Sequence, residues 1–183
     1  QNVAVGYQTL DANTTGSFNV AMGTSALGSD TLGARNVAIG HAALTTQNFT
    51  SSSNSYNVAV GFQAGLSTTT GTNNTFIGGL SGDANTTGGS NVAVGKSSFS
   101  DNTTGSNNTA MGNAILQGNI AGGNNTGVGS GALQSTTNSN NTAIGYASLL
   151  TNVGGNNNTA VGVSAMQLNV SGTHNTAVGV DAL

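Results

Sequence analysis

The chain has 183 residues, of which none is Cys, Pro, Trp or Glu and only seven are formally charged. Without Cys, neither a disulfide nor a thiolate metal site can form. Two cationic residues cannot make the basic face that nucleic-acid binding requires. No apolar run approaches the roughly 20 residues of a membrane-spanning helix. These absences exclude nucleic-acid binding and membrane insertion for this segment, and they leave few side chains for catalysis.

Three residue types, 29 Gly, 27 Asn and 26 Thr, make up nearly half of the chain. Such a composition is typical of disordered, low-complexity segments. The pentapeptide N-[VT]-A-[VIM]-G nevertheless recurs eleven times, with Phe or Gly at its third position in one copy each. Eight of the ten spacings are 17 residues, one is 21 and one is 16. The chain is therefore a repeat protein, with a four-residue insertion within residues 46–56 and a single deletion near residues 137–140.

The motif has the pattern of a short β-strand. With its Asn as position 0, position +1 is always Val or Thr, position +3 is always Val, Ile or Met, and position +2 is Ala in nine copies. This alternation and these residue types favour a strand, whereas Gly at +4 of every copy disfavours a helix. A meander of hairpins is the competing fold, but it would favour Asn-Gly turns, and the chain contains no Asn-Gly dipeptide.

One repeat is too small to bury its own apolar residues, so neighbouring repeats must stack. Parallel strands about 4.8 Å apart would place eleven coils over about 50 Å. We therefore predict an all-β parallel β-solenoid, or β-roll, of about eleven 17-residue coils, with residues 1–183 as a single repeat domain. The insertion within residues 46–56 should bulge out as a loop without changing the register. Because the chain starts one residue before a motif and stops within a repeat, we expect it to be a slice of a longer fibre.

Stacking would place identical residues above one another. We expect the amides of the motif asparagines to hydrogen-bond from coil to coil as a structural ladder. These residues are Asn2, Asn19, Asn36, Asn57, Asn74, Asn91, Asn108, Asn125, Asn141, Asn158 and Asn175. Glycines at +4 and +14 should form corners that need a positive φ. The turn glycines at +4 are Gly6, Gly23, Gly40, Gly61, Gly78, Gly95, Gly112, Gly129, Gly145, Gly162 and Gly179.

The repeat resembles the head repeats of trimeric autotransporter adhesins, whose motif is similar to NSVAIG. Residues 107–112 (NNTAMG) and 157–162 (NNTAVG) match it position for position. It also resembles fibre regions of phage tail proteins. The resemblance covers essentially the whole chain and implies a left-handed parallel β-roll and a side-by-side homotrimer, although the repeat here is longer and contains an extra N-T-T-G tract. Trimerisation also agrees with a strand that is apolar on both faces, because small Ala and Gly would let chains approach closely.

We therefore expect a non-catalytic structural segment of an extracellular fibre, either a cell-surface adhesin or a virion tail fibre, that forms a rigid, protease-resistant rod. The alternative is a binding module whose outer polar face, or the loop within residues 46–56, contacts a glycan, matrix or ice. Thr pairs such as Thr86-Thr87 would be the ice-facing array. Aromatic residues at +5, namely Tyr7, Phe62 and Tyr146, could stack on sugars. Because other residue types occupy +5 in the remaining copies, we expect core-edge packing or chance occurrence instead.

No enzyme, cofactor or metal is expected. His41 and His174 occupy different repeat positions, and we expect both to be surface turn residues. Asp11 and Asp83 share a position but lie several coils apart, so they form no carboxylate pair for acid–base chemistry. The glycine-rich run 127–131 lacks the Lys of a nucleotide-binding loop.

Overall fold

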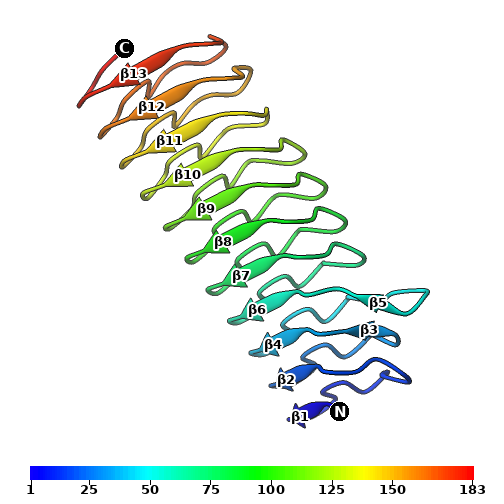
Figure 1. Ribbon diagram of the computed structural model, residues 1–183. Coiled ribbons are helices and arrows are strands. Elements are labelled where there is room, and N and C mark those ends of the chain that lie inside the picture. Colours follow the sequence, from blue (N-terminus) through cyan, green and yellow to red (C-terminus); the bar gives the residue numbers. More distant parts are fainter.

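The computed structural model describes all of residues 1–183, which form an all-β parallel solenoid without a helix. Its coils stack in chain order, and each contributes one short strand to an eleven-stranded sheet (Figure 1). The predicted fold class is therefore confirmed. No helix long and apolar enough to cross a bilayer is present. The strands of this sheet are β1 (Val3–Val5), β2 (Val20–Met22), β4 (Val37–Ile39), β6 (Val58–Val60), β7 (Thr75–Ile77), β8 (Val92–Val94), β9 (Thr109–Met111), β10 (Thr126–Val128), β11 (Thr142–Ile144), β12 (Thr159–Val161) and β13 (Thr176–Val178).

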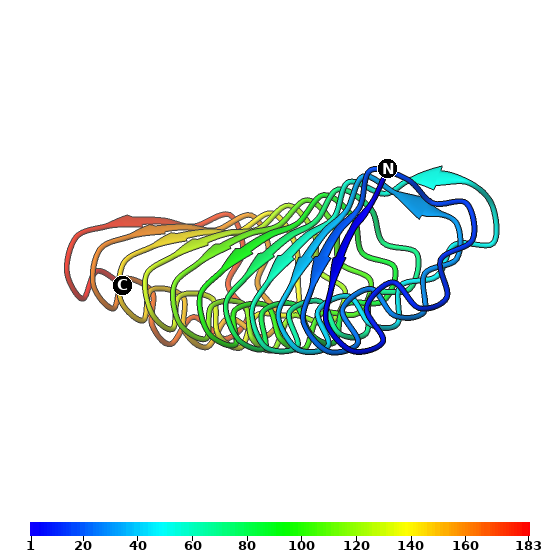
Figure 2. The ribbon, with the colours of Figure 1, turned by 90° about the horizontal axis from the view of Figure 1, so that it is seen from below.

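Every strand pair of the eleven-stranded sheet joins the same repeat positions, so its register follows the motif. It continues across the 21-residue coil, where Val37 pairs with Val58, and across the 16-residue coil, where Thr126 pairs with Thr142. The longer coil adds a second, two-stranded sheet, β3 (Gly33–Ala34) with β5 (Ser53–Asn54). This small sheet projects beyond the other turns (Figure 1), while the main strands lie side by side in one layer with the turn segments on the other side (Figure 2).

The interior is narrow because position +2 of the strand faces inward and is almost always Ala. Ala21, Ala38 and Ala93 are fully buried, and so are leucines at +8 such as Leu27 and Leu116 on the opposite side of the coil. These two positions supply most of a single core cluster of 23 residues. The inner face of the strand therefore packs against Leu side chains rather than against a second sheet.

The Leu side of each coil is a series of turns. Non-glycine residues at +6 and +8 have positive φ, for example 58° at Ser25 and 51° at Leu27. Positive φ costs a residue with a Cβ about 1–2 kcal/mol. In compensation, Leu27 is fully buried and its N–H donates to the carbonyl oxygen of Ala43 in the next coil at 2.9 Å. Coil-to-coil bonding thus extends beyond the strands: of 110 backbone hydrogen bonds, only 21 lie within strands.

Glycines occupy two positions for two different reasons. Those at +4 have φ between 112° and 143°, a region that excludes other residues. The expectation of positive φ at +14 is wrong, because those glycines have ordinary φ angles. Space explains them instead: a Cβ on Gly88 would overlap the carbonyl oxygen of Gly105 in the next coil. Glycine at +14 therefore permits the closest approach between coils.

The motif asparagines form a continuous ladder that is buried from Asn19 to Asn158. Across all ten intervals the side-chain oxygen of one Asn accepts the backbone N–H of the next at 2.9–3.1 Å. The side-chain nitrogen donates to a carbonyl at +14, as from Asn91 to Gly105 at 2.8 Å. Most rungs are thus side chain to backbone. Direct amide-to-amide bonds, such as that from Asn108 to Asn91 at 3.2 Å, supplement them.

A second polar ladder, not evident from the repeat motif, lies at position +11, but it is interrupted. Side-chain bonds join five of its nine intervals, and Thr68 Oγ1 and Asn119 Oδ1 are buried without a partner. Asn102 donates to Oδ1 of Asn85 at 2.8 Å, and both residues are fully buried. Asp30, also fully buried, takes this position in the second coil, where it accepts from Gln47 at 2.7 Å and from the N–H of Gly33 at 3.0 Å. The interior therefore combines a thin apolar strip with two polar ladders.

In two neighbouring coils, a large side chain at +2 fills the space left by glycines at +8. Gly65 and Gly82 replace Leu at +8, and Phe76 replaces Ala at +2 between them. A Cβ on Gly65 would lie 2.9 Å from Phe76 Cδ2, and one on Gly82 would overlap the ring. The Phe76 ring therefore occupies the space of the missing leucines. In the same way, Ile115 fills the volume left open by Gly127, whose added Cβ would lie 2.6 Å from Ile115 Cγ2.

This exchange predicts a rescue. Phe76→Ala should lower the free energy of unfolding by about 3–5 kcal/mol, because it leaves a cavity lined by two glycines. Adding Gly82→Leu should recover part of that loss, since the φ of 59° at Gly82 matches the leucines at the same position. Urea unfolding of the single and double variants measures both effects. If Gly82→Leu is equally harmful with Phe76 present or absent, the compensation is refuted.

The Asn ladder predicts a large difference between two asparagines. Asn91→Ala removes the acceptor of the Asn108 N–H and the donor to Gly105, and each buried group left unpaired costs about 1–3 kcal/mol. Asn113→Ala, on the exposed surface, should change stability by less than about 0.5 kcal/mol. Denaturant unfolding of both variants compares them. Equal losses would contradict a stabilising role for the ladder.

Candidate functional site

The side chains at +1 and +3 of the eleven strands point outward and form one face, here called the outer sheet face. None of its 22 positions is charged. Val5 is 54% exposed, Met111 46% and Ile144 42%. The +3 residues are Val5, Met22, Ile39, Val60, Ile77, Val94, Met111, Val128, Ile144, Val161 and Val178. Because contiguous exposed apolar surface marks interaction sites, the outer sheet face is the main candidate site.

The expectation that small Ala and Gly residues would lie between neighbouring chains is wrong. Ala at +2 faces the interior, as Ala59 and Ala110 show with no exposed surface. The physical reason is the width of a 17-residue coil: the leucines at +8 leave room for a methyl group but not for Val or Ile. The larger aliphatic side chains are consequently outside, and any partner on this face would contact Val, Ile, Met and Thr.

Aromatic residues at +5 border the outer sheet face instead of packing at the core edge. Tyr7 is 72% exposed, Phe62 54% and Tyr146 63%. Position +5 directly follows the glycine corner, which turns these side chains outward. His41 stacks on Phe62 with ring centroids 5.4 Å apart and planes inclined by 14°. His174 lies on the surface far along the stack, with Nε2 3.4 Å from Nδ2 of Asn157, so the two histidines share no site.

The insertion loop is held at its base by buried groups. Phe49 is 7% exposed, and Gln47 accepts from Asn57 Nδ2 at 2.8 Å. The Ser55 hydroxyl donates to Asn36 Oδ1 at 2.8 Å, inside the first ladder. Residues 50–52, in contrast, are exposed. The loop is thus a surface feature fixed to the core.

The threonine pairs are only partly available to a ligand. The first Thr of a pair donates its hydroxyl to a carbonyl of the next coil, as Thr86 does to Thr103 at 2.8 Å and Thr69 to Thr86 at 3.1 Å. The second Thr, such as Thr87 or Thr104, is exposed. In these pairs one hydroxyl therefore stabilises the stack and the other Thr is exposed, whereas in the pair Thr136-Thr137 both hydroxyls donate to carbonyls of the next coil, at 2.9 and 2.6 Å.

Asp83 and Asp101 interact across neighbouring coils. Burial raises the pKa of the Asp83 carboxyl above its ordinary value of 3.8, and repulsion from Asp101 adds to the shift, while a backbone hydrogen bond opposes it. Asp83 Oδ1 is buried without a hydrogen-bond partner. The repeat pattern did not indicate this repulsion because the two residues stand at different repeat positions. No three His, Cys, Asp or Glu side chains gather in a metal-binding arrangement.

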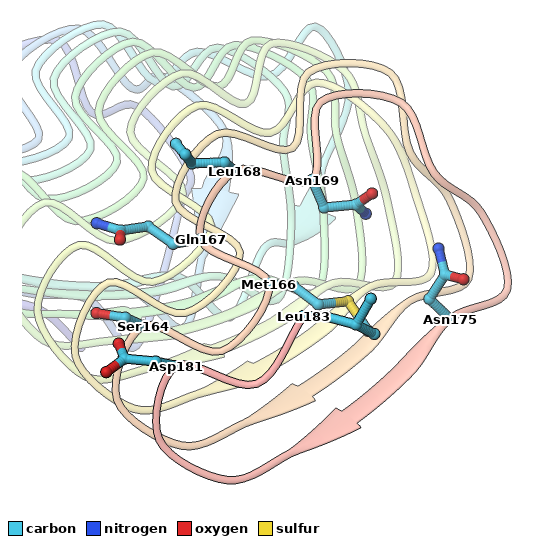
Figure 3. Close-up of a pocket in the computed structure, with 8 residues that line it drawn as sticks. All are labelled: Ser164, Met166, Gln167, Leu168, Asn169, Asn175, Asp181 and Leu183. Atoms are coloured by element: carbon cyan, nitrogen blue, oxygen red, sulfur yellow. The ribbon is translucent and has the colours of Figure 1, made fainter.

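A cavity of about 490 Å³ lies at the last coil (Figure 3). Its lining includes Met166 at +8 and Asn169 at +11, positions that the following coil covers elsewhere in the stack. Asp181 is its one charged residue. The cavity is therefore the uncovered end of the core.

Comparison with known proteins does not identify a function for this chain, so the candidate sites are inferred from its own structure. No family model matches the chain, and no curated protein or solved structure matches it either. Two surfaces remain as candidates: the outer sheet face, and the surface beside the insertion loop.

The raised pKa of Asp83 predicts a pH-dependent effect on stability. Because the folded-state pKa exceeds the unfolded value of about 3.8, the folded chain binds more protons, and stability falls as pH rises through that window. Asp83→Asn should therefore raise the melting temperature at about pH 7 and leave it unchanged at about pH 3. Asp11→Asn, at the same repeat position but exposed, is the control. Thermal melts at both pH values test this, and an equal gain at both would refute it.

Proposed function

We propose that this chain is a non-catalytic structural segment of an extracellular fibre, of the cell-surface adhesin or phage tail-fibre kind. Its copies associate side by side as a homotrimer through the outer sheet face. The observation that supports this proposal is the composition of that face: eleven strands expose β-branched and Met side chains, with no charge at any of its 22 positions. A solvent-facing sheet ordinarily alternates apolar residues inside with polar residues outside.

The stack suits a mechanical role. Backbone hydrogen bonds around each coil and two buried polar ladders join neighbouring coils, so pulling a coil away would break many bonds together. A single insertion interrupts the otherwise short turns. Two cationic residues leave almost no cleavage sites for trypsin-like proteases. Rigidity and protease resistance are the properties that a fibre segment needs.

Energetics favours association through this face. The core of each coil consists of a few apolar side chains, mostly Ala and one Leu, so an isolated roll has a thin core. Removing the exposed Val, Ile and Met side chains from water would add about 25 cal/mol per Å² of apolar area buried. The net charge of −3 is small and none of it lies on this face, so repulsion between copies is weak. Three-fold symmetry in particular rests on the resemblance to adhesin heads.

Sedimentation equilibrium of the chain tests this proposal. We expect a mass near 53.1 kDa, three times 17.7 kDa. Met111→Glu places a charge in the middle of the outer sheet face and should shift the mass towards 17.7 kDa, because burying an unpaired carboxylate is costly. Thr104→Glu, exposed elsewhere on the coil, should leave the mass unchanged. A wild-type chain that sediments as a 17.7 kDa monomer and melts cooperatively would contradict self-association.

A further inference from the structure

The position just before the motif Asn departs from the repeat in three consecutive coils. All its residues from the second coil on have positive φ. In seven coils the residue is small or polar, namely Asn73, Ser90, Asn107, Asn124, Asn140, Asn157 and His174. Asn tolerates this conformation best. Phe18 (62°), Arg35 (65°) and Tyr56 (51°) occupy it instead, although large side chains adopt this conformation less readily than Asn does.

These three residues form a stack on the surface. The Arg35 guanidinium carbon lies 5.0 Å from the centroid of the Phe18 ring and 5.9 Å from that of Tyr56. Arg35 is thus held between aromatic rings from the preceding and following coils. Its Nε–H donates to Asn54 Oδ1 at 3.0 Å, which leaves the two terminal amino groups without a hydrogen-bond partner. Phe18 is 52% exposed and Tyr56 50%, so the stack is open to solvent.

The insertion supports this stack. Asn54, which positions the guanidinium, belongs to β5, and β5 pairs with the β3 residues that precede Arg35. The base of the loop is held by Ser55, which is fully buried and donates a hydrogen bond to Asn36 Oδ1. The exposed part of the loop, residues 50–52 (Thr-Ser-Ser), carries uncharged hydroxyl groups. The one insertion in eleven repeats therefore lies in the coil that completes the stack.

We propose that Phe18, Arg35 and Tyr56 form a binding site for an acidic glycan. The terminal amino groups of Arg35 donate to a carboxylate or sulfate oxygen of the sugar, as guanidinium forks do in bidentate pairs. The exposed parts of the Phe18 and Tyr56 rings pack against the apolar faces of neighbouring sugar units. The loop hydroxyls and Asn54 bond sugar hydroxyls. Aromatic contacts on both sides of the cation hold it in place before the ligand arrives, which reduces the entropy lost on binding.

A glycan fits this site better than an acidic polypeptide does. The chain has two cationic residues and a net charge of −3, so it offers no extended basic surface for a run of carboxylates. One fixed guanidinium instead matches a single anionic group on one sugar unit. The site does not depend on the fibre role, because all of its residues come from one chain.

Binding assays on the full chain test the proposal. The probes are oligogalacturonate, which bears carboxylates, a carrageenan oligosaccharide, which bears sulfates, the neutral maltoheptaose, and poly-glutamate. We expect binding to at least one acidic glycan and none to maltoheptaose, and the comparison of the two acidic glycans identifies the anionic group. Arg35→Gln should weaken binding about tenfold or more. Lys96→Gln removes the chain's other cation, which is exposed in a distant coil, and should have no effect.

Further variants separate binding from folding. Phe18→Asn and Tyr56→Asn introduce the residue most frequent at this position, so each should keep or raise the melting temperature while weakening glycan binding. Arg35→Lys keeps the charge without the planar fork and should also weaken binding. The proposal is overturned if no acidic glycan binds, if Arg35→Gln and Lys96→Gln weaken binding equally, or if poly-glutamate binds as tightly as the glycans.

Discussion

The bond on which the rest of the structure depends joins the side chain of one motif Asn to the backbone of the next. Its oxygen accepts the N–H of the following Asn, and its nitrogen in most coils donates to a carbonyl at +14, as in Asn91. Both backbone groups lie at corners, where strand pairing does not satisfy them. A shorter side chain would not reach both, and a Cβ at +14 would push the coils apart. Asn at 0 and Gly at +14 are thus two parts of one constraint.

This constraint determines where the apolar residues lie. With polar ladders at 0 and +11 taking up interior space, the core between them consists mainly of Ala at +2, Ala at +7 and Leu at +8. The remaining aliphatic side chains are outside, on the outer sheet face. A solenoid built in this way is continuous and stiff but has a thin core, which is why we propose that its copies associate. The high content of Gly, Asn and Thr, which first suggested disorder, is instead what the ladders and corners of a close stack require.

The sequence predicted the strand, its register and the +4 corners, because these depend on residue types that recur at fixed spacing. It did not predict the ladder at +11, because Asn, Asp, Gln and Thr all occupy that position and their shared burial follows only from the closed coil. Nor did it predict which strand face is inward, since Ala and Val are both apolar. Phe76 against Gly82, and Arg35 between Phe18 and Tyr56, are contacts between coils that single irregular residues make. A consensus repeat omits residues that occur in only one coil, so it cannot predict these contacts.

Amide hydrogen exchange tests the role of the ladder most directly. The backbone N–H groups of Asn91, Asn108 and Asn125 donate to side-chain oxygens at 2.9–3.0 Å rather than to backbone carbonyls. If these bonds hold the coils together, the three amides should exchange as slowly as those of β8 and β9, which open only when the stack opens. Exchange as fast as that of the exposed loop residues 50–52 would show that the ladder does not hold neighbouring coils together.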